Sequence, residues 1–368
     1  MSTATSLKLT LPRRPLADRF GTAANVTPTR TPKPVLQNVL LTVTEGQVIL
    51  SATDLELSVT LPLTGVRCDG DGSVLLPAAK VGKILATVPD DEITVEADGE
   101  KLLIQGGRSR FSLPCESVEL YPHIEPSTAD NEFCRDIPGA ELRRLIRQTI
   151  YATDMNSPRY ALAGVRAEAT DQGLRLVATD GRRLAMAGNR TASVSPGSPV
   201  LPIKALRLID RLAGETARLA WDDKTAWIET DGIEIQTRLV EGRFPAYESI
   251  FPANRAAIAT INAAELLAAI EQAAITTSEE SRGVDLAFAA GELALRSSAA
   301  DVGESTVRLP LEYAGEPLTL TFDHRYMSDA IKALDGGTLL NLELFGPKSP
   351  LIVKAEGFTY VVMPLTRD

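Results

Sequence analysis

A weak internal repeat constrains the fold of this chain more than any other sequence feature. Three β-rich segments recur at near-equal spacing and end in small polar residues: VILSATD at 48–54, LRLVATD at 174–180 and LALRSS at 293–298. A repeat of this kind indicates similar structural modules placed one after another along the chain. The chain of 368 residues also exceeds what one hydrophobic core usually organises. The sequence therefore predicts three similar modules.

Each module is expected to contain two helices among many short strands. A strand that runs into an amphipathic helix recurs at 74–88, 200–214 and 318–334. A second helical pattern stands near each module's start, at 11–24, 138–152 and 263–274. This mixture predicts an α+β fold for every module.

Polar stretches at 125–131 and 252–259 each precede a new first helix, so the module boundaries are expected there. They divide the chain into an N-terminal domain 1–128, a central domain 129–254 and a C-terminal domain 255–368.

Composition excludes several classes of protein. No apolar run approaches the roughly 18 residues that span a bilayer, and the N-terminus lacks the pattern of a secretory signal, so a cytoplasmic protein without membrane contact is expected. The three cysteines are far apart and outside any CxxC spacing, which argues against a disulfide framework, a metal site or another cofactor site. The net charge of −10 makes a simple basic DNA-binding domain improbable, so any nucleic-acid role depends on where the basic residues lie.

Basic residues are concentrated on the expected helices. Leu142, Leu145, Ile146 and Ile150 form an apolar stripe, while Arg143, Arg144 and Arg147 share another face of the same helix. The helix at 203–212 carries Lys204, Arg207 and Arg211 opposite its apolar side, and the first module has Lys80 and Lys83 beside its own stripe. Solvated faces are the ordinary explanation of such a pattern, but its recurrence favours contact with phosphates. The third module departs from the pattern, because Glu265 and Glu271 occupy its first helix.

Five ordered motifs resemble the bacterial sliding clamps, the beta subunits of DNA polymerase III. They are VLQNVLLTVTEGQVILSATDLELSV at 35–59, GRSRFSLP at 107–114, RLVATDGRRLAM at 175–186, RLVEGRFPAYESIFP at 238–252 and YVVMPL at 360–365. The resemblance implies a head-to-tail homodimer that closes into a ring, with helices inside and sheets outside. It further implies a non-catalytic protein that encircles duplex DNA, without sequence specificity, and confers processivity on the replicative polymerase.

The resemblance also implies partners and sites. The expected partners are the polymerase III catalytic subunit, the clamp loader, and other polymerases and repair proteins that carry clamp-binding motifs. Their hydrophobic peptides would enter a pocket formed by Leu162, Thr179, Gly181, Arg182, Arg183, Leu184, Pro245, Ser249, Ile250, Val361, Met363, Pro364 and Leu365. The DNA-facing residues would be Arg30, Lys80, Arg143, Arg147, Gln148, Lys204, Arg207 and Arg211. The dimer interface would pair Phe111 and Leu113 with Ile275 and Thr276.

Two departures and two alternatives accompany this interpretation. Arg182 replaces the histidine of the TDGHRL form of the motif, and the chain finishes Thr366-Arg367-Asp368 instead of a short basic-hydrophobic tail, so partner preference is expected to differ. One alternative is an enzyme in which Asp54 and Asp180 act as an acid/base pair, although equivalent aspartates of two repeats are more typical of turns. No GxxxxGK[ST], GxSxG or HExxH motif supports catalysis. The other alternative is a specialised clamp-like scaffold that keeps the pocket but no longer serves chromosomal replication.

Overall fold

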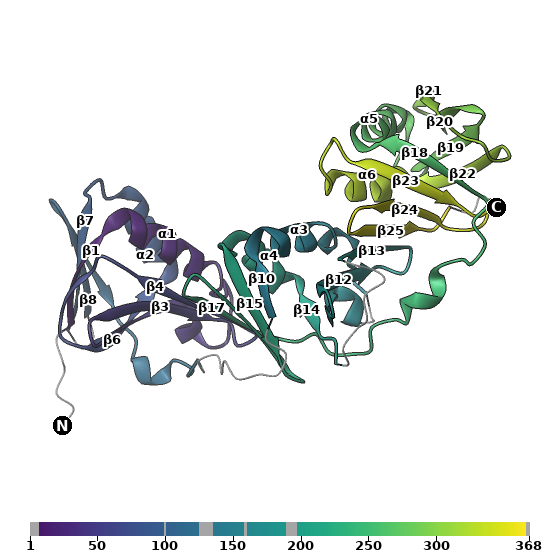
Figure 1. The fold of residues 1–368 in the computed structure, drawn as a ribbon. Coiled ribbons are helices and arrows are strands. Elements are labelled where there is room, and N and C mark those ends of the chain that lie inside the picture. The colour runs from purple at the N-terminus through teal and green to yellow at the C-terminus, as the bar shows by residue number, and fades with distance from the viewer. Residues whose placement is uncertain (1–6, 99–100, 125–134, 158–159, 189–196, 366–368) are drawn as a thin grey trace. The chain divides into compact units, whose positions relative to one another are not determined.

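The structure is a computed structural model that describes residues 7–98, 101–124, 135–157, 160–188 and 197–365 (Figure 1). The chain forms two compact units. Residues 1–139 and 211–238 make the first, and residues 140–210 and 239–368 make the second. The second module therefore contributes strands to both units.

The three modules share one order of elements, as the repeat predicted, except that the first contains one additional short strand, β5 (Arg67–Asp69). The first consists of β1 (Leu7–Pro12), α1 (Arg13–Ala24), β2 (Asn38–Thr44), β3 (Gln47–Thr53), β4 (Leu57–Leu63), β5 (Arg67–Asp69), β6 (Gly72–Pro77), α2 (Ala78–Thr87), β7 (Glu92–Asp98), β8 (Lys101–Gly106) and β9 (Ser109–Pro114). The second consists of β10 (Arg135–Pro138), α3 (Gly139–Arg147), β11 (Gly164–Thr170), β12 (Gly173–Thr179), β13 (Arg183–Ala187), β14 (Val200–Pro202), α4 (Ile203–Leu212), β15 (Thr216–Trp221), β16 (Thr225–Thr230) and β17 (Ile233–Arg238). The third consists of β18 (Ala257–Asn262), α5 (Ala263–Ala273), β19 (Gly283–Ala289), β20 (Gly291–Ala299), β21 (Gly303–Leu311), β22 (Leu318–Asp323), α6 (His324–Lys332), β23 (Leu339–Leu344), β24 (Leu351–Ala355) and β25 (Phe358–Val362). The α+β prediction is confirmed.

Neighbouring modules are joined by shared antiparallel sheets. In the first unit, β17 pairs with β4 and creates the order β10-β15-β16-β17-β4-β3-β2-β6. In the second unit, β13 pairs with β25 and creates the order β14-β11-β12-β13-β25-β24-β23-β18. Two smaller sheets, β5-β1-β7-β8-β9 and β21-β20-β19-β22, end in β9 and β21. Strand β9 is the last strand of its module, as β17 and β25 are of theirs. Strand β21 holds the place in its module that β4 and β13 hold in theirs.

The expected apolar stripes of the helices are buried, which explains why the helices form at these positions. Helix α2 buries Val81, Ile84 and Leu85, and α4 buries Ile203, Leu206 and Ile209. The helix expected at 138–152 is shorter than predicted, because α3 ends at Arg147 and residues 150–152 form a 3-10 turn. There the Thr149 hydroxyl donates to the Leu145 carbonyl, a contact that competes with regular helical hydrogen bonding.

Candidate docking site and helix faces

The two equivalent aspartates fix tight turns. Asp54 accepts hydrogen bonds from the backbone N–H groups of Glu56 and Leu57 at 3.0 and 2.7 Å. Asp180 accepts from Arg182 and Arg183, both at 2.9 Å. Each carboxylate thus stabilises the turn between two paired strands, which confirms the structural interpretation of these residues.

Several residues expected to line the peptide pocket are buried in the second unit. Leu184 and Val361 face each other across the β13–β25 pair, and both pack in a core cluster with Phe244 and Tyr247. Phe244 and Tyr247 come from the segment at 244–251, which contains the 3-10 helix η5 (Tyr247–Ile250). Leu162 and Thr179 are also buried. These four predicted pocket residues therefore lie beneath the surface rather than on it.

Apolar side chains nearby in sequence stay exposed and can form a rim. Ile250 is 37% exposed, Met363 45% and Leu365 38%. The Met363 N–H donates to the Arg182 carbonyl at 2.9 Å, so the C-terminal segment runs beside the turn after β12. The remaining predicted residues of this region are exposed or half-buried: Gly181, Arg182, Pro245, Ser249 and Pro364.

Arg183, one of the predicted pocket residues, makes several contacts that the sequence did not predict. Its guanidinium donates to Asp180, to Asp329 on α6 and to the Tyr151 carbonyl at 3.0, 2.8 and 2.7 Å. It also lies over the rings of Tyr151 and Tyr326, at 5.5 and 4.5 Å from their centroids. Burial works to lower the pKa of Arg183, but the hydrogen bond with Asp329 and the neighbouring charges raise it. The Arg183 guanidinium therefore stays charged. Arg183 therefore ties the second module to the third inside this unit.

Sequence reasoning missed a buried ionic cluster beside Phe244 and Tyr247. The Glu168 side chain on β11 is 1% exposed and forms ion pairs with Arg175 at 2.6 Å and Arg166 at 3.1 Å. The Tyr247 hydroxyl donates to the same carboxylate at 3.0 Å. Arg166 also lies over the Phe244 ring at 5.8 Å. The cluster therefore fixes the segment at 244–251 against the sheet. Alternation along β11 and β12 could have placed Glu168 and Arg175 on one face, but not Tyr247.

A polar cleft of about 550 Å³ adjoins the rim. Arg182 and Arg183 line it from the turn after β12, and Arg325, Tyr326 and Asp329 line it from α6. Arg182 therefore lines this cleft with its side chain, while its carbonyl accepts the hydrogen bond from Met363.

The predicted DNA-facing residues fall into two groups. The exposed group consists of Arg30, Lys80, Arg147, Lys204, Arg207 and Arg211, whereas Arg143 is half-buried. Gln148 is buried and accepts a hydrogen bond from Arg144 at 2.8 Å, so its amide orients a basic side chain. Arg147 pairs with Asp210 across α3 and α4 at 2.7 Å.

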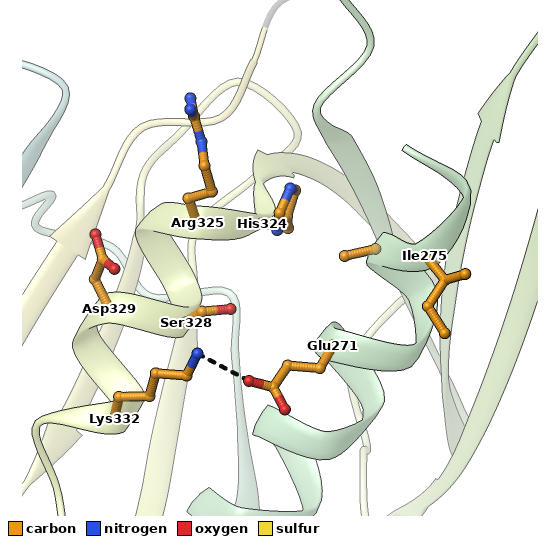
Figure 2. Close-up of a pocket in the computed structure, with 8 residues that line it drawn as sticks. Glu271, Ile275, His324, Arg325, Ser328, Asp329 and Lys332 are labelled. Carbon is orange, nitrogen blue, oxygen red and sulfur yellow. Dashed lines mark ion pairs between the residues drawn. The ribbon is translucent and has the colours of Figure 1, made fainter. Parts of the chain in front are cut away.

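On the corresponding helix face of the third module, the basic side chains Lys332 and Arg325 form ion pairs with carboxylates of the same module. Figure 2 shows Lys332 on α6 reaching Glu271 on α5, and the two groups are 2.9 Å apart. Arg325 is held by Asp323, the N-cap residue of α6, at 2.6 Å. Burial works to raise the pKa of Asp323, but the hydrogen bonds and charge of Arg325 hold it below the ordinary value.

The predicted interface residues lie on or beside the two edge strands. Phe111 and Leu113 alternate with exposed residues on β9 and are half-buried. Ile275 is 74% exposed on the short helix η6 (Ala274–Thr276), and the Thr276 hydroxyl lies 2.6 Å from that of Ser297 on β20.

The described residues lack both a metal-binding cluster and a membrane-spanning helix. They contain no group of three or more His, Cys, Asp or Glu side chains that could hold a metal ion. No helix among them is long and apolar enough to cross a membrane. Cys68 and Cys115 are free thiols, while Cys134 lies outside the described residues.

A chain of three like modules, in which neighbouring modules are joined through shared antiparallel sheets, has the architecture of a clamp-type protein. Comparison with known families gives three consecutive matches to the DNA polymerase III beta subunit: its N-terminal domain at residues 7–125, its central domain at 136–246 and its C-terminal domain at 248–366.

Individual relatives agree with these matches. The beta sliding clamp of Caulobacter vibrioides is 30% identical over 374 residues, covering 98% of this chain and 100% of the relative. That of Proteus mirabilis is 31% identical over 340 residues, covering 90% and 92%. The crystal structure of the Pseudomonas aeruginosa sliding clamp bound to griselimycin superposes with a TM-score of 0.90 at 28% identity, covering 99% of this chain and 100% of that one. The chain therefore belongs to the DNA polymerase III beta subunit family, the beta sliding clamps, whose members are non-catalytic polymerase subunits.

Proposed function

We propose that two copies of this chain close head to tail into a ring that encircles duplex DNA in the cytoplasm and confers processivity on the replicative polymerase. The observation that carries this proposal is the pair of unused edge strands. β4 and β13 hold equivalent places in the first two modules, and both are paired with the last strand of another module. Their equivalent in the third module is β21, and the remaining last strand is β9. Pairing β21 with β9 of a second copy would complete the series.

The repeat also gives the register of this junction. The two internal junctions oppose Ile235 with Val59 and Tyr360 with Ala185. The strand pairings of each module can be traced residue by residue, starting from the residue that precedes each helix. This comparison makes Phe111 the equivalent of Ile235 and Tyr360, and Ser305 the equivalent of Val59 and Ala185. Phe111 would then oppose Ser305 of the partner subunit. The Ser305 hydroxyl donates to the carbonyl of Ala273, two residues before Ile275, which supports the interface inferred from the resemblance.

Replacing Phe111 with aspartate is expected to dissociate the dimer. A buried interface aromatic commonly contributes about 2 kcal/mol or more, and a carboxylate in its place would be desolvated without a partner, so the dissociation constant should rise at least ~30-fold. Analytical ultracentrifugation measures the change. The matched control is Leu120→Asp, a substitution of an apolar residue that is 68% exposed on η2 (Val118–Leu120) of the same unit. A Phe111→Asp protein as dimeric as this control would contradict the proposed interface.

The apolar site of the second unit is proposed to dock the partners. The polymerase III catalytic subunit, the clamp loader, and other polymerases and repair proteins would each insert a short hydrophobic peptide against Ile250, Met363 and Leu365. A thioether such as that of Met363 can adapt to several ligands, which suits a shared site. The three clamp domains are proposed at 1–128, 129–254 and 255–368. The family matches support the first boundary closely and put the second junction several residues earlier.

Shortening the rim should weaken peptide binding without affecting the dimer. Ile250→Ala and Met363→Ala are each expected to raise the dissociation constant of a clamp-binding peptide about 5- to 30-fold, because each removes roughly 1–2 kcal/mol of apolar contact. Fluorescence anisotropy of a labelled clamp-binding peptide from the polymerase III catalytic subunit measures this change. Leu339→Ala, at a residue 64% exposed on β23, is the control and should leave the affinity unchanged. Equal affinities for all three variants would exclude this surface as the docking site.

A further inference from the structure

The helix faces of the second and third modules can be compared residue by residue. Pro138 and Asn262 immediately precede α3 and α5, and Pro202 and Asp323 immediately precede α4 and α6. Counting from these residues places Glu271 where the second module has Arg147, and Lys332 where it has Arg211. Ser328 stands in the place of Arg207. The two faces are therefore built on one frame but carry different charges.

The third module neutralises its remaining cations internally. Lys332 is paired with Glu271 at 2.9 Å and Arg325 with Asp323 at 2.6 Å. In the second module, Arg147 has the partner Asp210, but Arg207 and Arg211 are exposed and have no ion pair among the described residues. A carboxylate beside an ammonium group opposes the approach of a phosphate twice, by neutralising the cation and by repelling the anion.

We infer that Glu271 acts as a built-in limiter of DNA contact, so that the α5–α6 face (Glu271, Arg325, Ser328 and Lys332) binds duplex DNA more weakly than the α3–α4 face. This inference rests on the proposed encirclement of DNA. Each phosphate that a cation neutralises adds sequence-independent affinity, so a helix face with fewer available cations holds the duplex less tightly. Topological closure supplies retention, and weak contact on one helix face preserves movement along the duplex. Glu271 sets this balance by holding Lys332 (Figure 2).

Removing the negative charge of Glu271 should strengthen DNA binding. Glu271→Gln releases Lys332 while keeping the size and helix propensity of the side chain. Each added phosphate contact steepens the logarithmic salt dependence of binding by roughly 0.9, which corresponds to an affinity gain of about three- to tenfold per subunit near 0.1 M salt. Fluorescence anisotropy of a short labelled linear duplex, titrated with the full-length dimer at several salt concentrations, measures both quantities.

Two further variants separate the local mechanism from a general charge effect. Glu271→Gln combined with Lys332→Ala should return the affinity to that of the unmodified protein, because the released cation is gone. Glu292→Gln removes the partner of Arg308 from a surface ion pair on the sheet β21-β20-β19-β22, and should leave DNA binding unchanged. A gain that persists in the double variant, or one equalled by Glu292→Gln, would overturn the inference.

The same assay distinguishes this inference from the proposed function. Arg207→Ala and Arg211→Ala should weaken DNA binding and lower the salt dependence, because these side chains lie on the face assigned to DNA. If they weaken binding while Glu271→Gln has no effect, the limiter is contradicted and the DNA-facing assignment stands. If neither arginine variant changes binding, the proposed DNA-facing surface itself is wrong.

Discussion

Oxidation of an Arg110→Cys/Thr306→Cys variant is expected to link two subunits covalently at both junctions of the ring. The ladders of the repeat oppose Arg110 to Thr306 of the partner subunit, as Glu234 opposes Thr60 and Thr359 opposes Met186 within the chain. Directly opposed residues in a hydrogen-bonded antiparallel pair have Cα atoms about 5.5 Å apart, which suits a disulfide. Non-reducing electrophoresis should show that oxidation has converted most of the protein to a covalent dimer.

A shifted pair tests the register rather than mere proximity. Arg308 lies on the same face of β21 two residues further on, so Arg110→Cys/Arg308→Cys should cross-link far less. The single-cysteine variants control for Cys68, Cys115 and Cys134. Equal cross-linking of both pairs would mean that the subunits do not join by continuing the sheet in the inferred register.

Replacing Glu168 with alanine is expected to cause the largest loss of stability of any substitution considered. It would leave Arg175, whose side chain is 6% exposed, without its carboxylate partner and deprive Arg166 and Tyr247 of theirs. Breaking a buried ion pair from one side costs about 3–5 kcal/mol, because the remaining charge stays desolvated. Thermal unfolding followed by circular dichroism measures the loss.

The control removes a similar but exposed carboxylate. Glu229→Ala breaks the pair with Arg218, in which both side chains are more than 40% exposed, and should cost no more than about 1 kcal/mol. Tyr247→Phe keeps the ion pairs and loses only the hydroxyl, so it should lower stability by roughly 1–2 kcal/mol and loosen the 244–251 segment. A Glu168→Ala protein as stable as Glu229→Ala would show that the buried cluster does not stabilise this unit.

Periodic and repeated features were predictable from the sequence. The helices followed from apolar spacing, and the structural role of Asp54 and Asp180 followed from their equivalent places in two repeats. Both kinds of signal are local, so they survive without knowledge of the tertiary structure.

The sequence could not reveal contacts between distant residues. Glu168 and Tyr247 are 79 positions apart, and Arg183 and Asp329 are 146 apart, so neither pairing follows from any local pattern. For the same reason, the burial of Leu184 and Val361 beneath Phe244 and Tyr247 could not be predicted, and their place in the peptide pocket stays a prediction. The hydrogen bond from Arg144 to the side-chain oxygen of Gln148 was also not predicted, and the place of Gln148 near DNA stays a prediction.

The measurement that tests encirclement most directly compares closed circular with linear DNA. The Arg110→Cys/Thr306→Cys protein is loaded onto nicked circles by the clamp loader, oxidised, and washed at high salt, where electrostatic contacts are screened. The account predicts that the covalent ring stays on the circles and leaves when the DNA is cut with a restriction enzyme. Retention that is salt-labile and equal on circular and linear DNA would contradict encirclement.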